Sequence, residues 1–276
     1  MNSSQVKYGI MSSSSTVSEL NSLDSEFESF DSFGSLAYLR EYYSVIDQEN
    51  DALLAFFAKN YKHLRNVKTV LEFGGGPTLY SLISAASKVT EIHFSEYLKH
   101  NRHEIRKWIR AHKRAFNWNH FIRRALELEG QKKVTPGQVY RRAELLKSKL
   151  KKVVKCNAFR KFSLKHNKFK RYDVVSVNFV PESITSKRDE WEQAIRNISA
   201  LVKPKGYLFI TSLKNSKYYM LDGKKFPAIK IDESDMITIL GENGFDISKI
   251  VIRSITAHPF RGYEGMMFIR VRKKSA

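Results

Sequence analysis

The sequence predicts an α/β fold with a doubly wound sheet that is mostly parallel and has an antiparallel last strand. From about residue 68 onward, short apolar runs alternate with segments of helical periodicity, a pattern typical of a parallel sheet covered on both faces. A glycine turn directly follows the first apolar run. The last two runs are separated by only about ten residues, too few for a crossover helix, so they must pair antiparallel. With 276 residues, 42% of them hydrophobic, the chain can bury one sizeable core.

Residues 1–35 differ in composition from the rest of the chain. They contain 12 serines and five acidic residues against one lysine, without a sustained apolar period. We expect this Ser-rich, acidic tail to be largely disordered and residues 36–276 to form a single domain. The formal charge of the whole chain is +20, so removing the −4 of the tail leaves +24 on the remainder. Such a charge suggests an anionic partner or surface, but it says nothing about the fold.

The predicted elements follow from local periodicity and turn residues. Apolar residues at helical spacing predict helical structure within 36–60, and a short strand at 68–73 runs into the glycine turn. Pro77 suits the first turn of a helix that follows. A second strand, 91–95, ends at Glu96. The other predicted elements are helices at about 101–109 and 116–130, a basic helical insertion within 131–152, strands at 153–157, 173–178, 207–212, 249–255 and 265–272, and helices near 188–202 and 232–243.

Cysteine usage and hydropathy bound the cellular setting. Cys156 is the single cysteine, which excludes an intramolecular disulfide framework and any multi-cysteine metal site and fits a reducing compartment. No apolar stretch approaches 18 residues, and the N-terminus lacks the pattern of a secretory signal. No metal-ligand spacing is evident, and His93 on an apolar strand is expected to be structural. We therefore expect a soluble, cytoplasmic protein without a bound metal or a membrane partner.

The glycine turn and the end of the second strand indicate a nucleotide-type ligand. Gly74, Gly75 and Gly76 let a ligand approach the backbone at the carboxyl end of the sheet. A dinucleotide-binding turn would carry a third glycine where Leu79 stands. Glu96, 22 residues after Gly74, fits the hydroxyl groups of a ribose. This combination favours S-adenosylmethionine over NAD.

Six longer strings together resemble a known family. They are LEFGGGPTLYSLISAA (71–86), EIHFSEYLKHN (91–101), EIRKWI (104–109), FNWNHFI (116–122), LELEG (126–130) and LKNSKYYM (213–220). With them, the sequence from about Tyr38 to Lys273 is similar to the nicotinamide, phenylethanolamine and indolethylamine N-methyltransferases. The resemblance implies a Rossmann-like methyltransferase sheet, S-adenosylmethionine as cofactor, and transfer of a methyl group to a nitrogen of a small-molecule amine or pyridine-type acceptor. It also implies that residues 36–60 form a helical lid over the cofactor.

The resemblance also implies which residues bind the cofactor. Asn157 stands where the family usually has an acid for the adenine amino group, and an amide oxygen can still accept a hydrogen bond from that group. Glu96 stands where an acid holds the ribose. The cofactor-binding residues carried over are Tyr38, Tyr43, Gly74, Gly75, Gly76, Thr78, Tyr80, Glu96, Tyr97, Asn101, Asn157, Ala158 and Asn178.

On the acceptor side, the resemblance implies five residues: Tyr38, Asn178, Glu182, Ser212 and Tyr219. Glu182 matches an acid that recognises the acceptor or its amine, and we expect it to be catalytic. A protonated amine has no lone pair, so a carboxylate can hold the cation and take its proton, directly or through water. Several relatives carry an acid near position 212, where this chain has Ser212.

Two other classes of protein remain open at this stage. Basic residues between 102 and 124, interleaved with aromatic residues, and the run 131–171 can serve a nucleic-acid-binding or RNA-modifying methyltransferase. Solvated helix faces explain most such runs, and residues 178–181 lack the Pro-Pro-aromatic sequence of base-amine methyltransferases. A catalytically idle scaffold has no physical need for an acid at the end of the second strand. We therefore expect a monomer that binds a small-molecule acceptor.

Overall fold

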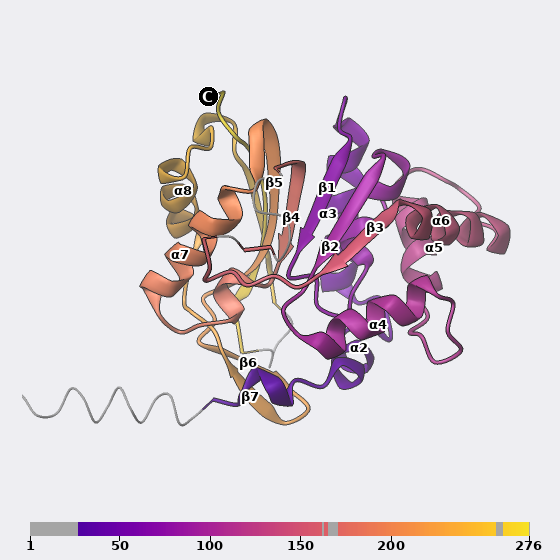
Figure 1. Ribbon diagram of the computed structural model, residues 1–276, viewed down its shortest axis with the longest axis horizontal. Helices are drawn as coiled ribbons and strands as arrows, with labels where there is room; N and C mark the ends of the chain where they lie inside the picture. The colour runs from indigo at the N-terminus through magenta and orange to yellow at the C-terminus, as the bar shows by residue number, and fades with distance from the viewer. Residues whose placement is uncertain (1–26, 162, 165–170, 258–261, 276) are drawn as a thin grey trace, which may run out of the picture.

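The computed structural model describes residues 27–161, 163–164, 171–257 and 262–275, and its centre is a seven-stranded sheet (Figure 1). The strand order is β3-β2-β1-β4-β5-β9-β8, so the chain starts in the middle of the sheet and winds outward in both directions. This confirms the predicted doubly wound α/β fold. The strands are β1 (Thr69–Phe73), β2 (Glu91–Ser95), β3 (Leu150–Val154), β4 (Tyr172–Asn178), β5 (Val202–Lys214), β8 (Val251–Thr256) and β9 (Gly265–Arg272).

Strand directions bring several strand ends to the same edge of the sheet. β1 pairs in parallel with β2 and β4, which places Phe73 beside Ser95 and Val177. β9 runs antiparallel to both β5 and β8, which confirms the predicted antiparallel last strand. Consequently the start of β9 lies at the same edge as the carboxyl ends of the parallel strands.

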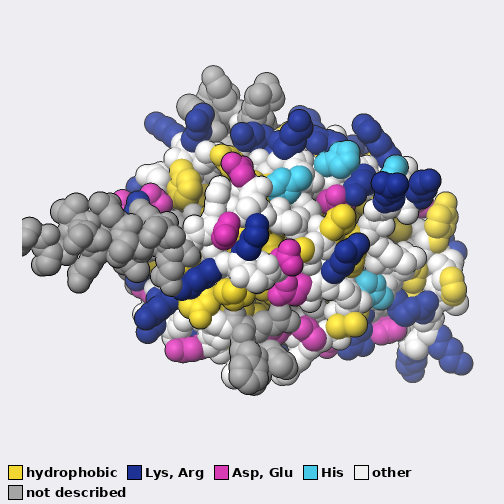
Figure 2. Space-filling model, turned by 90° about the horizontal axis from the view of Figure 1, so that it is seen from below, with side chains coloured by type: hydrophobic (Ala, Val, Ile, Leu, Met, Phe, Trp, Pro, Cys, Tyr) yellow, Lys and Arg dark blue, Asp and Glu magenta, His cyan; other side chains and the backbone are white. Residues whose placement is uncertain are grey.

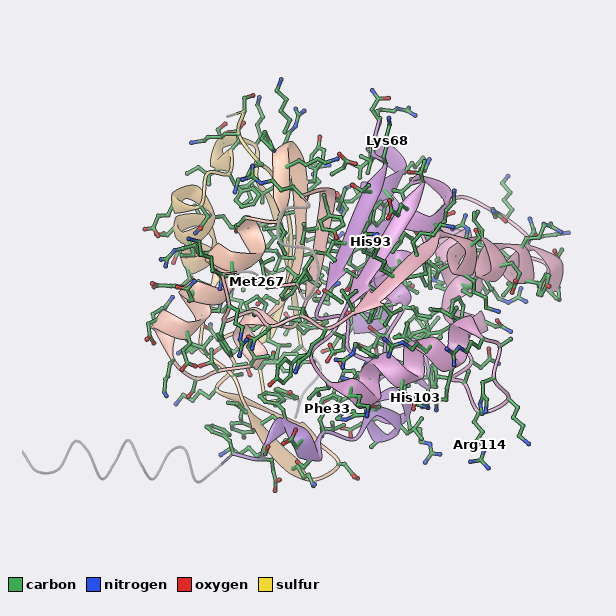
Figure 3. All side chains as sticks on the ribbon, in the orientation of Figure 1. Phe33, Lys68, His93, His103, Arg114 and Met267 are labelled. Carbon is green, nitrogen blue, oxygen red and sulfur yellow. The ribbon has the colours of Figure 1, made fainter. Side chains whose placement is uncertain are left out.

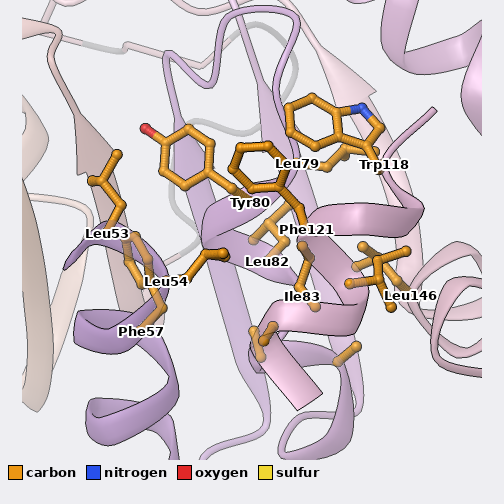
Figure 4. Packing of buried hydrophobic residues seen from close by; sticks show 14 of the residues in the cluster. Leu53, Leu54, Phe57, Leu79, Tyr80, Leu82, Ile83, Trp118, Phe121 and Leu146 are labelled. Carbon is orange, nitrogen blue, oxygen red and sulfur yellow. The ribbon is translucent and has the colours of Figure 1, made fainter. Parts of the chain in front are cut away.

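Helices cover both faces of the sheet, as Figure 1 shows. Successive residues of β1 point to opposite faces: Val70 packs in the cluster of α2 to α6, whereas Leu71 packs in the cluster of α7 and α8. Figure 4 shows part of the first cluster, including Phe121 and the pair Phe57 and Tyr80, whose ring centroids are 6.1 Å apart. The helices are α2 (Ser35–Tyr43), α3 (Gln48–His63), α4 (Lys99–Ile109), α5 (Asn119–Leu128), α6 (Pro136–Lys149), α7 (Arg188–Ser199) and α8 (Glu233–Glu242).

The predicted helix after Pro77 is wrong. The segment instead forms two short 3-10 turns, η2 (Tyr80–Leu82) and η3 (Ala85–Ser87). Residues 77–86 are all buried, because α3 packs against η2 and α6 packs against η3. An amphipathic helix needs a solvated face, and this segment has none.

The part of the expected disordered tail that the structure describes contains a short helical turn. Residues 1–26 lie outside the described residues, but residues 27–34 are described and include the 3-10 turn η1 (Phe30–Ser32). The ring centroids of Phe30 and Phe33 lie 5.6 and 5.9 Å from the ring centroid of Phe226. Phe226 belongs to a hairpin of β6 (Tyr218–Leu221) and β7 (Lys224–Pro227) that was not predicted from the sequence.

The hairpin and α2 close the carboxyl edge of the sheet. The predicted helical segment 36–60 contains two helices, and the side chain of Asp47 caps the second by accepting a hydrogen bond from the amide of Asn50 at 2.8 Å. The Tyr42 hydroxyl donates to the carbonyl of Met220 at 2.6 Å, which ties α2 to the hairpin. Figure 3 shows Phe33 at this end of the molecule and Lys68, just before β1, at the opposite end.

The expectations for His93 and for a helix in the basic insertion are met. His93 in β2 is 1% exposed, and its Nδ1 lies 2.8 Å from the hydroxyl of Tyr172, which supports a structural role. The basic insertion predicted within 131–152 forms α6, which begins with a capping box of Thr135 and Gln138. The last three residues of that range instead belong to β3, which spans Leu150–Val154 and not the predicted 153–157. Within the residues that the structure describes, none of the helices is both long and apolar enough to cross a membrane.

One basic side chain of the insertion is buried and paired. Arg142 is 9% exposed and donates to both carboxylate oxygens of Glu129, at 2.8 and 2.7 Å, and to the carbonyl of Ile83 at 3.0 Å. Arg142 therefore attaches α6 to the segment after β1 instead of forming part of a solvated basic face.

We expect Arg142→Ala to lower the free energy of unfolding by about 3 kcal/mol, because it leaves the carboxylate of Glu129 without its partner in a largely buried place. Urea denaturation followed by circular dichroism measures this change. Arg141→Ala on the exposed side of the same helix is the control and should change stability by about 0.5 kcal/mol or less. Equal losses in the two variants would contradict the assignment.

Candidate functional site

A cavity of about 360 Å³ lies at the carboxyl edge of the sheet. Its walls come from the ends of β1, β2, β4 and β5, from the segment after β3, from α2 and α3, and from the hairpin residue Tyr219. The structure brings together at this cavity every site residue expected from the sequence except Glu182 and Ser212. The expected residues that line it are Tyr38, Tyr43, Gly74, Gly75, Gly76, Thr78, Tyr80, Glu96, Tyr97, Asn101, Asn157, Ala158, Asn178 and Tyr219.

The glycine turn has the backbone that its sequence requires. Gly74 and Gly76 have φ angles of 68° and 59°, a region that glycine adopts without strain. A Cβ at Gly75 would overlap the ring of Phe94, so this position has no room for a side chain. At Gly76, in contrast, a Cβ would meet no atom within 4 Å. The turn thus opens toward the cavity at Gly76, where a ligand can approach the backbone.

Glu96 is a buried carboxylate in the cavity wall. It is 6% exposed, and it accepts hydrogen bonds from the amides of Gly76 at 3.0 Å and Leu98 at 2.7 Å. Burial raises the pKa of this carboxyl, although these amides oppose the shift. A carboxylate has about four acceptor positions. The two amides and the side-chain nitrogen of Asn101 use three of them, so Glu96 can still accept from a ligand hydroxyl.

Asn101 and Asn157 line the cavity together with Glu96. The amide nitrogen of Asn101 is 3.4 Å from Glu96, and its Oδ1 accepts from the hydroxyl of Ser35 at 2.6 Å. Asn157 Oδ1 accepts from the amide of Phe159 at 2.9 Å, so this side chain is held by a local turn. Ser35 begins α2, so its contact with Asn101 connects the expected lid to the expected ribose end of the site.

Tyrosine rings form the wall beneath α2. The hydroxyls of Tyr38 and Tyr43 are 3.2 Å apart, and Tyr43 stacks on Tyr80 with ring centroids 5.4 Å apart. Burial raises the pKa of Tyr43, Tyr80 and Tyr219 well above the usual value of a phenol. These hydroxyls therefore stay neutral and can donate hydrogen bonds at any ordinary pH.

Asn178 faces the cavity, but its amide is engaged in a buried network. It donates to Glu72 at 2.8 Å and to Ser176 at 3.0 Å, and it accepts from Thr211 at 2.8 Å. Burial raises the pKa of Glu72 to about 7. These hydrogen bonds join the end of β4 to β1 and β5. They therefore hold Asn178 in place in the cavity wall.

Glu182 and Ser212 lie behind the cavity wall, while their neighbours Ser183 and Leu213 line it. Glu182 is 1% exposed and accepts from the amide of Leu213 at 2.9 Å. Its other carboxylate oxygen has no hydrogen-bond partner among the described residues, and burial raises its pKa to about 7. The structure therefore gives Glu182 a contact with the wall and none with the cavity.

Sequence reasoning missed several cavity residues. Asp47, Glu49 and Tyr263 line the cavity, and the hydroxyl of Tyr263 donates to Glu49 at 2.8 Å. Phe30 and Phe33 also line it, although they belong to the expected disordered tail. The apolar pair in a Ser-rich segment was a usable signal for the phenylalanines. Nothing local marks Glu49, which begins a helix among other polar residues.

Comparisons with known proteins show the family and the fold of this chain. A profile described as the NNMT/PNMT/TEMT family matches residues 22–274. Indolethylamine N-methyltransferase of Oryctolagus cuniculus is 28% identical over 75% of this chain and 77% of its own length. Nicotinamide N-methyltransferase of Homo sapiens is 27% identical over 75% of this chain and 77% of its own length. A solved S-adenosylmethionine-dependent methyltransferase from Methanosarcina mazei has the same fold, with a TM-score of 0.50 at 15% identity, covering 79% of this chain and 98% of that protein.

We expect Glu96→Ala to weaken the binding of S-adenosylmethionine about tenfold or more, because each charge-assisted hydrogen bond to the ribose contributes about 1.5–3 kcal/mol. Isothermal titration calorimetry measures the affinity. Glu127→Ala, which removes an acid outside the cavity, is the control and should leave the affinity unchanged. Unchanged affinity in the Glu96 variant would remove this residue from the site.

The buried carboxyl of Glu182 should make stability depend on pH. Its pKa is about 7 in the folded chain against a usual 4.5, so the folded state binds more protons between these values and the free energy of unfolding decreases as the pH rises through this window. Glu182→Gln stays neutral, so its stability relative to the original chain should increase by about 2–3 kcal/mol from about pH 5 to about pH 8. Urea denaturation at both pH values measures the difference, and a difference that does not change with pH would refute the raised pKa.

Proposed function

We infer the function of this chain from one premise: it belongs to the NNMT/PNMT/TEMT family. It is an S-adenosylmethionine-dependent N-methyltransferase that acts on small-molecule acceptors. The observation that best supports how it works is the cavity itself, which joins the open glycine turn and the buried carboxylate of Glu96 to an aromatic wall under α2.

The residues present fit the cofactor. Gly76 leaves the backbone open, and Glu96 presents a carboxylate to the cavity. We propose that Glu96 holds the ribose hydroxyls, that Asn157 and Ala158 contact the adenine, and that Tyr38 and Tyr43 close over the methionine part. When bound, S-adenosylmethionine supplies a methyl group on a positively charged sulfur, which is the leaving group.

For the acceptor we propose an amine or a pyridine-type nitrogen. The relatives are named for indolethylamine and nicotinamide, and the aromatic wall of Tyr38 and Tyr219 suits flat or apolar molecules of this size. The chain's own contribution is to orient the nitrogen and to exclude water, because proximity accounts for much of the acceleration in such transfers. Neutral tyrosine hydroxyls can orient the acceptor without adding charge.

We propose a supporting role for Glu182 instead of direct acid–base catalysis. Its carboxylate holds the amide of Leu213, and its own carbonyl accepts from the amide of Ile229 at 2.8 Å. Ile229 follows the hairpin of β6 and β7. Glu182 therefore connects the cavity wall at Leu213 to the segment that follows β7. A change at Glu182 would then act through the shape of the wall.

Nucleic acid is the less favoured partner. The cavity suits a small molecule, and Arg142 of the basic insertion is buried in an ion pair. We also propose that the chain works as a monomer in the cytoplasm, because a single cysteine suits a reducing compartment. Light scattering that gave twice the monomer mass of 32.0 kDa would refute the monomer.

The decisive experiment incubates the protein with methyl-labelled S-adenosylmethionine and a panel of phenylethanolamine, indolethylamine, nicotinamide and RNA. We expect label in at least one small acceptor and none in RNA. RNA affinity is measured at two salt concentrations in parallel, because contacts with phosphates lose about 0.7–0.9 in log K per contact for each tenfold rise in salt. Labelled RNA together with steep salt dependence would overturn the small-molecule proposal.

A further inference from the structure

Different strands of the sheet contribute residues to the two ends of the cavity. At one end lie Gly76, Glu96 and Asn157, which follow β1, β2 and β3, the three strands in one half of the strand order. Leu213 and Met266, also in the cavity wall, belong to β5 and β9 on the other side. If the cofactor occupies the first end, as proposed above, the acceptor lies at the second.

Glu49 is a buried carboxylate at the second end. It lies in the first turn of α3, is 8% exposed, and lines the cavity. Its Oε2 accepts from the hydroxyl of Tyr263 at 2.8 Å. Tyr263 precedes β9 and also lines the cavity, so the side chain of Glu49 is held against the acceptor wall by a residue from the far end of the chain.

The other polar residues of the acceptor end are poorly placed to supply a charge to a ligand. Positions 178 and 212 carry Asn178 and Ser212, and Glu182 lies behind the wall. Asp47 lines the cavity but already caps α3 through the amide of Asn50. Among the residues that the structure describes, Glu49 combines burial, contact with the cavity and a hydroxyl that orients its carboxylate.

Aromatic rings accompany this carboxylate. Tyr42, Tyr219 and Tyr263 all line the same cavity, and Tyr42 is 5.1 Å from Tyr38 between ring centroids. Ring faces attract cations, and a carboxylate forms its strongest hydrogen bonds with charged N–H donors. Figure 2 looks onto this end of the molecule and shows acidic side chains toward the middle of the face, while Lys and Arg are most numerous along its upper border.

We propose that Glu49, oriented by Tyr263, binds the positive charge of the acceptor and makes this chain prefer protonated amines to neutral pyridines; the bound ammonium releases its proton to water before its nitrogen takes the methyl group. The inference rests on the proposed function, because it names the class of acceptor for the same cavity. The proposal assigns recognition of the cation to a residue of α3 and not to a residue that follows a strand.

The test compares Glu49→Gln with the original chain on phenylethanolamine, a cation, and nicotinamide, which is neutral. We expect kcat/KM for phenylethanolamine to fall about tenfold or more, mainly through KM, and kcat/KM for nicotinamide to change less than about threefold. Asp51→Asn is the matched control: it removes an acid from the same first turn of α3, where Asp51 pairs with Arg124 outside the cavity. It should leave the ratio of the two kcat/KM values unchanged.

Calorimetric titration of the original chain and the Glu49→Gln variant with phenylethanolamine gives a second measurement that needs no turnover. Weaker amine binding to the variant, with unchanged affinity for S-adenosylmethionine, supports the proposal. Equal losses for both acceptors, or unchanged amine affinity, would show that Glu49 only stabilises α3 and Tyr263. If the original chain methylates neither acceptor, the proposed acceptor class fails, and the titration still decides whether Glu49 binds the cation.

Discussion

The burial of both faces of a parallel sheet is the constraint on which the rest of this structure depends. Val70 and Leu71 on β1 are both fully buried on opposite faces, so the strand leaves no polar surface along its length. Polar chemistry is confined to the carboxyl edge, where backbone groups and side chains are not used by the ladder. Among the buried polar residues of the sheet, Asn178 donates to Glu72, which ties the end of β4 to β1 at that edge.

The strands next to this edge could be predicted closely from the sequence. β2 and β9 have the predicted bounds, because each apolar run is bounded by a polar or glycine residue. The hairpin of β6 and β7 was missed, since its residues alternate poorly and are stabilised by the rings of Phe30 and Phe33 from elsewhere in the chain. The error after Pro77 has the same origin: periodicity assumes one solvated face, and tertiary packing removed it.

The two ends of the cavity differ in how far local sequence reveals them. The turn at Gly74 and the acid Glu96 are marked by their position directly after strands, so sequence reasoning could place both at the cavity. Glu49 and Tyr263 are 214 positions apart, and their contact arises only when β9 inserts beside β5. Glu182 illustrates the reverse case, because its position after a strand resembles a site residue while its carboxylate turns toward Leu213.

The close approach of Gly75 to Phe94 makes these two positions change together or not at all. The ring of Phe94 is fully buried and occupies the volume that a side chain at position 75 would need. A methyl group there requires a smaller residue at 94 and a shift of Glu72, whose Cγ would lie 2.8 Å from the added carbon. A smaller residue at 94 alone leaves a cavity beneath the turn, which costs stability. A sequence that replaces both residues one at a time must therefore pass through a variant that either is overpacked at position 75 or has a cavity at position 94. Both variants are less stable, which disfavours change of the glycine turn by single substitutions.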